Sequence, residues 1–437
     1  MGLFSTLNTS ATGLTVSSTN MNVIGDNIAN VNTFGFKASR ASFQDLLTQN
    51  VIGSGGIAQI GKGARLSDVV LNFAQGTFEN SSNVTDMAIN GNGFFVTRNP
   101  NSEDQLFTRA GNFYLDANGN FLSGAGYVMQ GYNADATGNI ATVLDDIKID
   151  TAVQPPSATT TVDMTINLNS GETAETVVAN QIDLTATSYF YDDLNSLADF
   201  STSVKIYDSL GEVHDMTVYF QKVGTAQWTF SAVVPTEEVN GGTPVTGDAT
   251  TVATGTLNFN TDGSFDTTTS AITPSATWGG FIGADPTQTI DVDFVTDGQL
   301  TQYGQESALT AIGQDGFPPG FLSYLDVNEE GIVMGAYSNG KQRQLAQVAL
   351  ATFKSNDGLE RRGGNMFAAT LDSDSPAIGA ADTGGRGSLN AYSLELSNVD
   401  LETEFVKMIG SQLGYQANSR VMSTTNDMLQ QLVNIVR

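Results

Sequence analysis

The chain has no cysteine among its 437 residues and only one histidine, His214. The absence of cysteine excludes disulfides, thiolate metal sites and cysteine nucleophiles. Positive charge is scarce, because 18 Lys and Arg stand against 46 Asp and Glu, and the formal net charge is −28. Phosphate contacts need Lys and Arg, so we expect neither nucleic-acid binding nor attraction to an anionic membrane.

No apolar run is long enough to span a bilayer, so membrane insertion is not expected. The N-terminus lacks the basic and apolar segments of a classical secretion signal, so a cleaved signal peptide is not expected either.

The acidic residues are unevenly distributed. Residues 151–320 contain 21 Asp and Glu against only Lys205 and Lys222, whereas each terminal fifty residues is close to neutral. An acidic middle repels its copies, while neutral ends can associate. The remaining composition, rich in Gly, Ser, Thr, Asn and Asp, is typical of β structure with many tight turns, and the length allows two or three domains.

Both ends of the chain carry apolar residues at every seventh position, the pattern of a helix that packs against a partner helix. The N-terminal stripe and its adjoining edge comprise Leu3, Leu7, Leu14, Met21, Ile24, Ile28 and Val31. The C-terminal stripe comprises Leu394, Leu401, Met408, Tyr415, Met422, Leu429 and Val436, to which we add Phe405. Each stripe is too narrow to form the core of a large domain. We therefore expect the two ends to pack together and then against copies of themselves.

The C-terminal helix also has a face of small residues. Gly410 and Gly414 form a G-x-x-x-G step, which Ala417 extends. Polar neighbours such as Glu402 and Gln412 are unsuited to lipid, so the step predicts close packing between helices within protein.

The pattern between the ends predicts a nested organisation. We expect an N-terminal helix (residues 1–30), a Gly-rich connector (31–75), a middle β domain (76–150 and 319–392), an inserted outer acidic β domain (151–318) and a C-terminal helix (393–437). The fold class is thus mixed and mainly β, with α-helical coiled-coil termini and a nested, multi-domain axial arrangement.

Motifs that could carry chemistry are incomplete. Residues 56–63 approach a phosphate-binding loop, but Gly63 stands where Ser or Thr would bind Mg²⁺, so a flexible connector is expected. Residues 326–337 and 116–121 begin like calcium loops and lack the terminal Glu or the central Gly, which favours turns. His214 reads as a structural residue in a hairpin. We expect no catalytic residue, no metal and no cofactor, and we do not expect an enzyme.

Several segments resemble the bacterial flagellar rod and hook protein family. The N-terminal signature spans residues 22–37 and the C-terminal one spans residues 397–418, with further agreement at 107–113, 126–132, 337–340 and 387–389. The motif residues in these signatures are Asn22, Asn27, Asn30, Asn32, Gly35, Asn398, Asp400, Gln416 and Asn418. The large insert, with Tyr207–Gly211, His214 and Gln314–Gly320, is similar to the hook branch, since distal-rod members are much shorter.

The resemblance implies a structural subunit of the flagellar hook. Copies would polymerise into a flexible helical tube lined by the terminal helices, which transmits motor torque to the filament as a universal joint. Besides itself, the implied partners are the distal rod, the hook cap, the hook–filament junction proteins and the flagellar type III export apparatus, which would place the protein outside the cell. Two alternatives stay open: a distal-rod or other axial component, and an extracellular acidic β-rich adhesin or enzyme.

Overall fold

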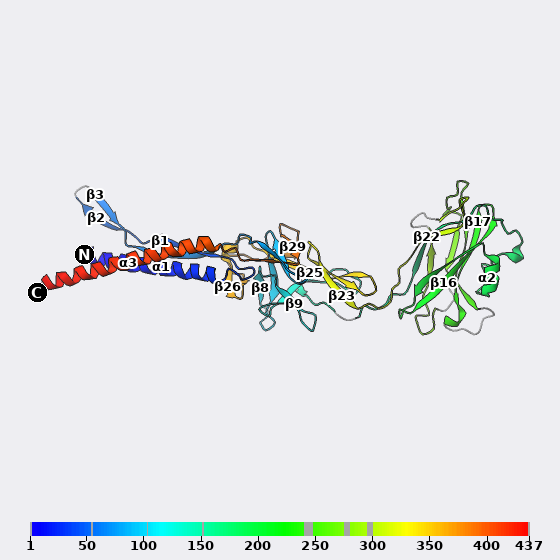
Figure 1. The fold of residues 1–437 in the computed structure, drawn as a ribbon, viewed down its shortest axis with the longest axis horizontal. Coiled ribbons are helices and arrows are strands. Elements are labelled where there is room, and N and C mark those ends of the chain that lie inside the picture. The colour runs from blue at the N-terminus through cyan, green and yellow to red at the C-terminus, as the bar shows by residue number, and fades with distance from the viewer. Residues whose placement is uncertain are drawn as a thin grey trace. The chain divides into compact units, whose positions relative to one another are not determined.

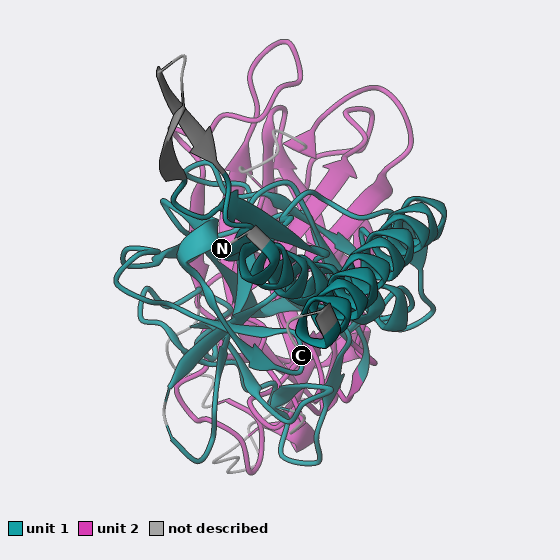
Figure 2. Ribbon diagram, turned by 90° about the vertical axis from the view of Figure 1, so that its left-hand side faces the viewer, with its two compact units in different colours: residues 1–151, 323–336, 342–437 teal, residues 152–322, 337–341 magenta. Residues whose placement is uncertain are grey.

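The computed structural model describes residues 2–53, 56–102, 104–150, 153–239, 248–274, 280–294 and 300–435; of Gly2, Ile435, 49–53 and 56–60 it describes the backbone alone. The chain forms two compact units, coloured separately in Figure 2. Unit 1 contains residues 1–151, 323–336 and 342–437, and unit 2 contains residues 152–322 and 337–341. The predicted fold class, mainly β with packed terminal helices, is confirmed.

Two long helices in unit 1 are formed by the ends of the chain. Helix α1 (Gly2–Ala29) and helix α3 (Leu401–Ile435) lie side by side, with both termini at the same end of the pair (Figure 1). The prediction that the C-terminal helix begins at residue 393 is wrong. Residues 393–395 form strand β30 (Ser393–Glu395), which is buried and pairs with β5 (Phe78–Asn80), and the helix begins only after Asp400.

The segment predicted as a Gly-rich connector is folded into two antiparallel pairs. Strand β1 (Ser39–Asp45) pairs with β4 (Ala64–Leu71), and β2 (Gln49–Gly53) pairs with β3 (Gly56–Ile60). Strands β1 and β4 contact α1. Gly63 has a φ of +108°, and a Cβ there would lie 2.1 Å from Thr12 Oγ1. Glycine is therefore needed here because the backbone has a positive φ and lies close to α1, and not because the segment must be flexible.

A larger antiparallel sheet forms the rest of unit 1, in the order β23-β24-β25-β11-β7-β8-β27-β26, with β28, β12 and the β9–β10 hairpin attached and the pair β6–β29 beside it. The bounds are β6 (Met87–Asn90), β7 (Phe94–Arg98), β8 (Gln105–Thr108), β9 (Phe113–Leu115), β10 (Phe121–Ser123), β11 (Val128–Asn133), β12 (Asp145–Asp146), β23 (Leu322–Val327), β24 (Ile332–Tyr337), β25 (Gln342–Thr352), β26 (Glu360–Gly363), β27 (Met366–Ala368), β28 (Ala377–Ala380) and β29 (Ser388–Ala391). Phe94, Phe107 and Phe367 lie in its core, where aromatic pairs meet edge to face, such as Phe107 and Phe353 at 4.8 Å.

Unit 2 is built from two sheets that face a shared core. One has the order β14-β18-β17-β16-β15 with β19 beside β18, and the other has β20-β13-β21 with β22 beside β13. The bounds are β13 (Thr161–Asn167), β14 (Ser188–Tyr189), β15 (Phe200–Tyr207), β16 (Val213–Gly224), β17 (Gln227–Pro235), β18 (Ala249–Asn258), β19 (Ala271–Pro274), β20 (Asp291–Asp293), β21 (Leu300–Thr301) and β22 (Ala308–Gln314), with the short helix α2 (Tyr191–Leu197).

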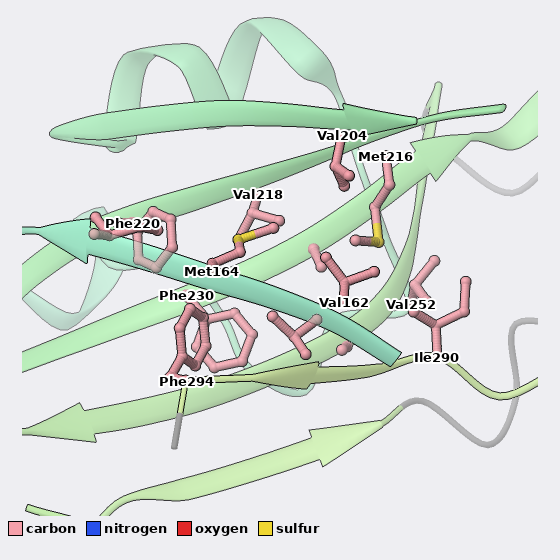
Figure 3. Close-up of a cluster of buried hydrophobic side chains, with 14 of the residues drawn as sticks. Val162, Met164, Val204, Met216, Val218, Phe220, Phe230, Val252, Ile290 and Phe294 are labelled. Atoms are coloured by element: carbon pink, nitrogen blue, oxygen red, sulfur yellow. The ribbon is translucent and has the colours of Figure 1, made fainter. Parts of the chain in front are cut away.

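Period-two patterning explains how these strands pack. In β13, Val162, Met164 and Ile166 are buried, and the residues between them are more exposed. Apolar side chains from both sheets meet in the core drawn in Figure 3, which includes Phe220 and Phe230. Alternation of this kind places one apolar face of each strand inward.

Candidate functional site: the paired terminal helices

The two terminal helices run antiparallel and in register. Four pairs of side chains define the alignment: Asn27 with Glu404, Asn20 with Ser411, Ser17 with Gly414, and Gly13 with Asn418. Residue numbers fall along α1 as they rise along α3. The spacings of seven, three and four residues are those of a coiled-coil seam.

The seam between α1 and α3 is made of small and polar residues. Ser10, Asn27, Glu404, Ser411 and Thr425 are all buried. Asn20 Nδ2 donates a hydrogen bond to Ser411 Oγ at 2.6 Å. Small residues let the helix backbones approach closely, and the buried polar groups need the hydrogen bonds that this approach permits.

The predicted apolar stripes only partly coincide with this seam. On α1, Ile24 is buried, and Leu3, Leu7, Leu14, Met21 and Ile28 are half-buried. Val31 is also half-buried but lies in the turn after α1, contrary to the prediction. On α3, Met408, Met422 and Leu429 are half-buried, whereas Leu401, Phe405 and Tyr415 are exposed. Leu394 is buried in strand β30 and does not belong to the helix, contrary to the prediction. Val436 lies outside the described residues.

Helix α3 exposes a second apolar face that the seven-residue pattern did not predict. Its members are Phe405, Val406, Ile409 and Leu413, whose exposed fractions range from 51% to 70%. Ile409 and Leu413 follow Phe405 at successive intervals of four, and Val406 lies seven residues before Leu413, so the four share one side of the helix. We call this set the outer face of α3. A second stripe offset from the first is the sequence signal that could have identified it.

Two of the predicted motif asparagines join segments that are distant in sequence. Asn27 Nδ2 donates to Ser39 O at 2.8 Å and to Glu404 Oε2 at 3.1 Å, and its Oδ1 accepts from Ser39 N–H at 2.8 Å. Asn398 Oδ1 accepts from Ala38 N–H at 2.8 Å, while its Nδ2 donates to the carbonyl oxygens of Asn72 and Ala74. Together they attach α1 and the start of α3 to the β1–β4 pair.

Asp400 caps helix α3. Its carboxylate accepts from Glu402 N–H at 3.1 Å and from Thr403 Oγ1 at 2.6 Å. The Thr403 hydroxyl is the main reason that the pKa of Asp400 is lowered. A carboxylate in this position also interacts favourably with the helix dipole.

The other motif residues are less connected. Asn30 Nδ2 donates to Asp26 O at 2.9 Å, and Asn418 Nδ2 donates to Gly414 O at 2.9 Å. Gly35 has a φ of +66°, and a Cβ there would lie 2.4 Å from Ala110 N, so only glycine fits. Asn22, Asn32 and Gln416 are exposed.

Of the residues predicted to pack closely, only Gly414 faces α1, where a Cβ would lie 3.3 Å from Ser17 Oγ. Gly410 has no atom within 4 Å of the position its Cβ would occupy, among the residues that are described, and Ala417 is exposed. The predicted role of Gly410 and Ala417 in close packing between helices therefore stays a prediction.

Glu395 forms a buried ionic centre at the base of the helices, which the sequence did not indicate. Its Oε1 lies 2.7 Å from Lys37 Nζ and its Oε2 lies 3.5 Å from Arg109 Nη1. Burial lowers the pKa of both Lys37 and Arg109, and the nearby carboxylate opposes this shift. Removing one member of such a buried set costs about 3–5 kcal/mol because a charge is left uncompensated.

No helix in the described part of the chain is long and apolar enough to cross a membrane. Both segments that begin like calcium loops form turns. In residues 116–121, Asp116 Oδ1 accepts hydrogen bonds from the Asn118 and Asn120 N–H groups. In residues 326–337, Asn328 and Gly331 form the turn of the β23–β24 hairpin.

Comparisons with known proteins agree along the whole chain. Four family models match: flagella basal body rod protein (residues 7–37), the D1 domain of flagellar hook protein FlgE/F/G (88–171), the D2 domain of flagellar basal body protein FlaE (180–317) and the C-terminal part of flagellar basal body rod FlgEFG protein (391–435).

Similar full-length relatives include two flagellar hook proteins FlgE. The one from Escherichia coli K12 is 35% identical over 97% of this chain and 98% of its own length, and the one from Brucella abortus is 30% identical over the full length of both. Among solved structures, the flagellar hook protein FlgE2 of Helicobacter pylori shares the fold. Its TM-score is 0.51 at 17% identity, and the match covers 71% of this chain and 99% of that one.

Proposed function

The chain belongs to the flagellar hook protein family, and from that premise we propose that its copies assemble through the outer face of α3. The protein is a structural subunit of the bacterial flagellar hook, an extracellular part of the flagellum. Its copies polymerise, and the packing of α3 against neighbouring copies is the step that we add.

The observation that supports this step is the exposure of apolar side chains opposite the α1 seam. Phe405, Ile409 and Leu413 are each more than half exposed in the subunit, although they lie on one helix that already packs against α1. A contiguous apolar face on a soluble helix indicates a protein contact.

Charge favours a second copy as the occupant of this face. Helix α1 contains Asp26 as its only charged residue, and α3 contains three acidic residues against Lys407 and Arg420. The helices therefore carry very little of the net charge of −28. Copies can approach along them without the repulsion that the acidic unit 2 imposes.

We further propose that the polymer acts as a flexible tube that transmits torque from motor to filament, with bending taken up by shifts between the β units of neighbouring copies. The same proposal includes the distal rod, the hook cap and the hook–filament junction proteins as partners, and export through the flagellar type III apparatus without a cleaved signal peptide. The alternatives of a distal-rod subunit or an acidic adhesin are not favoured, since the hook relatives match the chain over its full length and the insert matches a D2 domain.

The test is polymerisation of variants of the outer face. Ile409→Asp and Leu413→Asp would each bury a charge at a contact between copies, which costs several kcal/mol. We expect polymer yield, measured by sedimentation and electron microscopy, to fall at least tenfold. Asn8→Asp, at an exposed polar position on helix α1 rather than on the outer face of α3, is the matched control and should polymerise like the wild type. Normal polymers from both Asp variants of the apolar face would overturn the proposal.

A further inference from the structure

A histidine and two carboxylates meet at the turn between β15 and β16 in unit 2. Asp208, Glu212 and His214 each offer a ligand atom, and these atoms lie within 4.8 Å of one another. Asp208 and His214 are buried, with exposed fractions of 1% and 7%, whereas Glu212 is exposed. The turn is closed by a hydrogen bond from Gly211 N–H to Asp208 O at 3.1 Å.

The imidazole of His214 is held in one orientation. Its Nδ1 lies 2.7 Å from Glu238 Oε2, and its ring stacks on Phe281 with 3.5 Å between centroids and 5° between planes. The Nε2 atom is buried and has no hydrogen-bond partner in the described part of the chain. When Nδ1 donates its hydrogen to Glu238, the lone pair of the neutral ring lies on Nε2, which is the arrangement found at metal-bound histidines.

Asp208 presents a free carboxylate oxygen to this lone pair. Its Oδ1 accepts from the N–H groups of Leu210 and Glu212 at 2.9 and 2.7 Å, which fixes the carboxylate. Its Oδ2 lies 3.7 Å from His214 Nε2, too far for a hydrogen bond. Ligand atoms at about 2.0–2.2 Å from one zinc ion lie at most about 4.4 Å apart, so this separation suits a shared ion.

We propose that Asp208, Glu212 and His214 bind one divalent transition-metal ion, Zn²⁺ in particular, with Glu238 orienting the imidazole. One nitrogen and two oxygen ligands leave a fourth position for water. Glu212 is exposed and can swing toward the ion. This role differs from the purely structural one that the sequence predicted for His214.

The place of the turn suggests what the ion does. A Cβ on Gly211 would lie 2.5 Å from Pro319 and 2.8 Å from Pro156, so the turn packs against the segments that contain these prolines. Those segments pair with each other, Gln154 opposite Gly320 and Ser157 opposite Phe317, close to where the chain enters and leaves unit 2 at residues 152 and 322. A bound ion would stabilise the turn that supports them.

The single histidine makes the test direct. In the purified full chain labelled with ¹⁵N-histidine, the ring gives one pair of nitrogen resonances. Addition of ZnCl₂ in the presence of excess Mg²⁺ should shift the Nε2 resonance and saturate at one equivalent. Ring resonances unchanged at tenfold excess Zn²⁺ would show that the cluster is only an ion pair and would overturn the proposal.

Variants separate this site from diffuse binding to an acidic surface. Glu212→Gln removes an exposed ligand, so folding is not at risk, and it should weaken Zn²⁺ affinity at least tenfold. Glu238→Gln, which acts through His214, should weaken it about 10–100-fold. Asp215→Asn removes an exposed carboxylate from the same strand and should leave the affinity within twofold of the wild type. An equal loss in Glu212→Gln and Asp215→Asn would reject the site.

Discussion

Asn27 of α1 and Glu404 of α3, 377 positions apart, share a buried hydrogen bond in which Asn27 Nδ2 lies 3.1 Å from Glu404 Oε2. The same amide bonds both backbone groups of Ser39, at the first position of β1. Lys407 Nζ lies 2.7 Å from the other oxygen of Glu404 and balances its charge. One asparagine side chain thus connects both terminal helices and the first strand.

Replacing Asn27 should therefore loosen the helix pair. Asn27→Asp removes the donor to Glu404 and Ser39 and places a second carboxylate beside a buried one. We expect the free energy of unfolding to fall by more than the roughly 1–3 kcal/mol that is typical of an unsatisfied buried polar group. Faster hydrogen exchange in α1 and α3 would report it. Asn22→Asp, at an exposed position of the same helix, is the control, and equal exchange in the two variants would contradict this role for Asn27.

Two glycines in α1 should respond in opposite directions to alanine. At Gly25 a Cβ meets no described atom within 4 Å, so Gly25→Ala should stabilise the helix by about 1 kcal/mol. At Gly13 a Cβ would lie 2.7 Å from the amide of Asn418 and would displace a side chain that bonds Gly414 O. Gly13→Ala should therefore leave the stability of the helix unchanged or lower it. Hydrogen exchange of the α1 amides measures the stability of the helix in the two variants. An equal gain in stability in both would show that α3 does not approach Gly13 closely.

Local patterns in the sequence predicted elements well. The apolar run Phe94–Val96 lies in β7, where all three side chains are buried, as expected for a strand inside a core. The segment Met216–Phe220, which was predicted as a strand from its period-two pattern, lies in β16. Helix α1 covers Gly2–Ala29, where the seven-residue stripe predicted a helix.

The side-chain contacts between those elements could not be predicted in the same way. The packing of the two ends against each other is predicted and confirmed. The apolar stripes did not identify the side chains of the seam, so its polar contacts, such as the one between Asn20 and Ser411, could not be predicted. The buried ionic contacts of Glu395 could not be predicted because its partners, Lys37 and Arg109, come from segments far away in sequence. The connector was mistaken for a flexible segment because a glycine such as Gly63, at positive φ beside Thr12, looks the same in sequence as a flexible one.

Acid should weaken unit 2 partly through Asp266. Hydrogen bonds from the Thr268 and Thr269 side chains lower its pKa to about 2, against about 3.9 in an unfolded chain. A carboxylate with a lowered pKa stabilises the fold fully above the unfolded pKa, and this stabilisation is lost as pH falls toward the folded pKa. The gap in unfolding midpoint between wild type and Asp266→Asn should therefore be present at pH 7 and close between about pH 4 and pH 2.

Tryptophan fluorescence suits this measurement because Trp228 is fully buried in unit 2. Thr268→Val removes one of the bonds that lower the pKa and should show a smaller gap that closes over a similar range. A gap for Asp266→Asn that persists below pH 2 would contradict the assignment.

Gly410 and Gly414 can show whether small residues on α3 serve contacts within a subunit or between subunits. No described atom lies within 4 Å of the position that a Cβ on Gly410 would occupy, so Gly410→Ala should raise the stability of α3 in the monomer by about 1 kcal/mol. If a neighbouring copy packs against Gly410, the added methyl group should at the same time lower polymer yield. Gly414→Ala presses on Ser17 Oγ at 3.3 Å and should forfeit the gain in the monomer. Hydrogen exchange measures the stability of the monomer, and sedimentation measures the polymer yield. If the contact lies between copies, Gly410→Ala should raise the first and lower the second. A gain in both would place Gly410 on a surface that assembly leaves free.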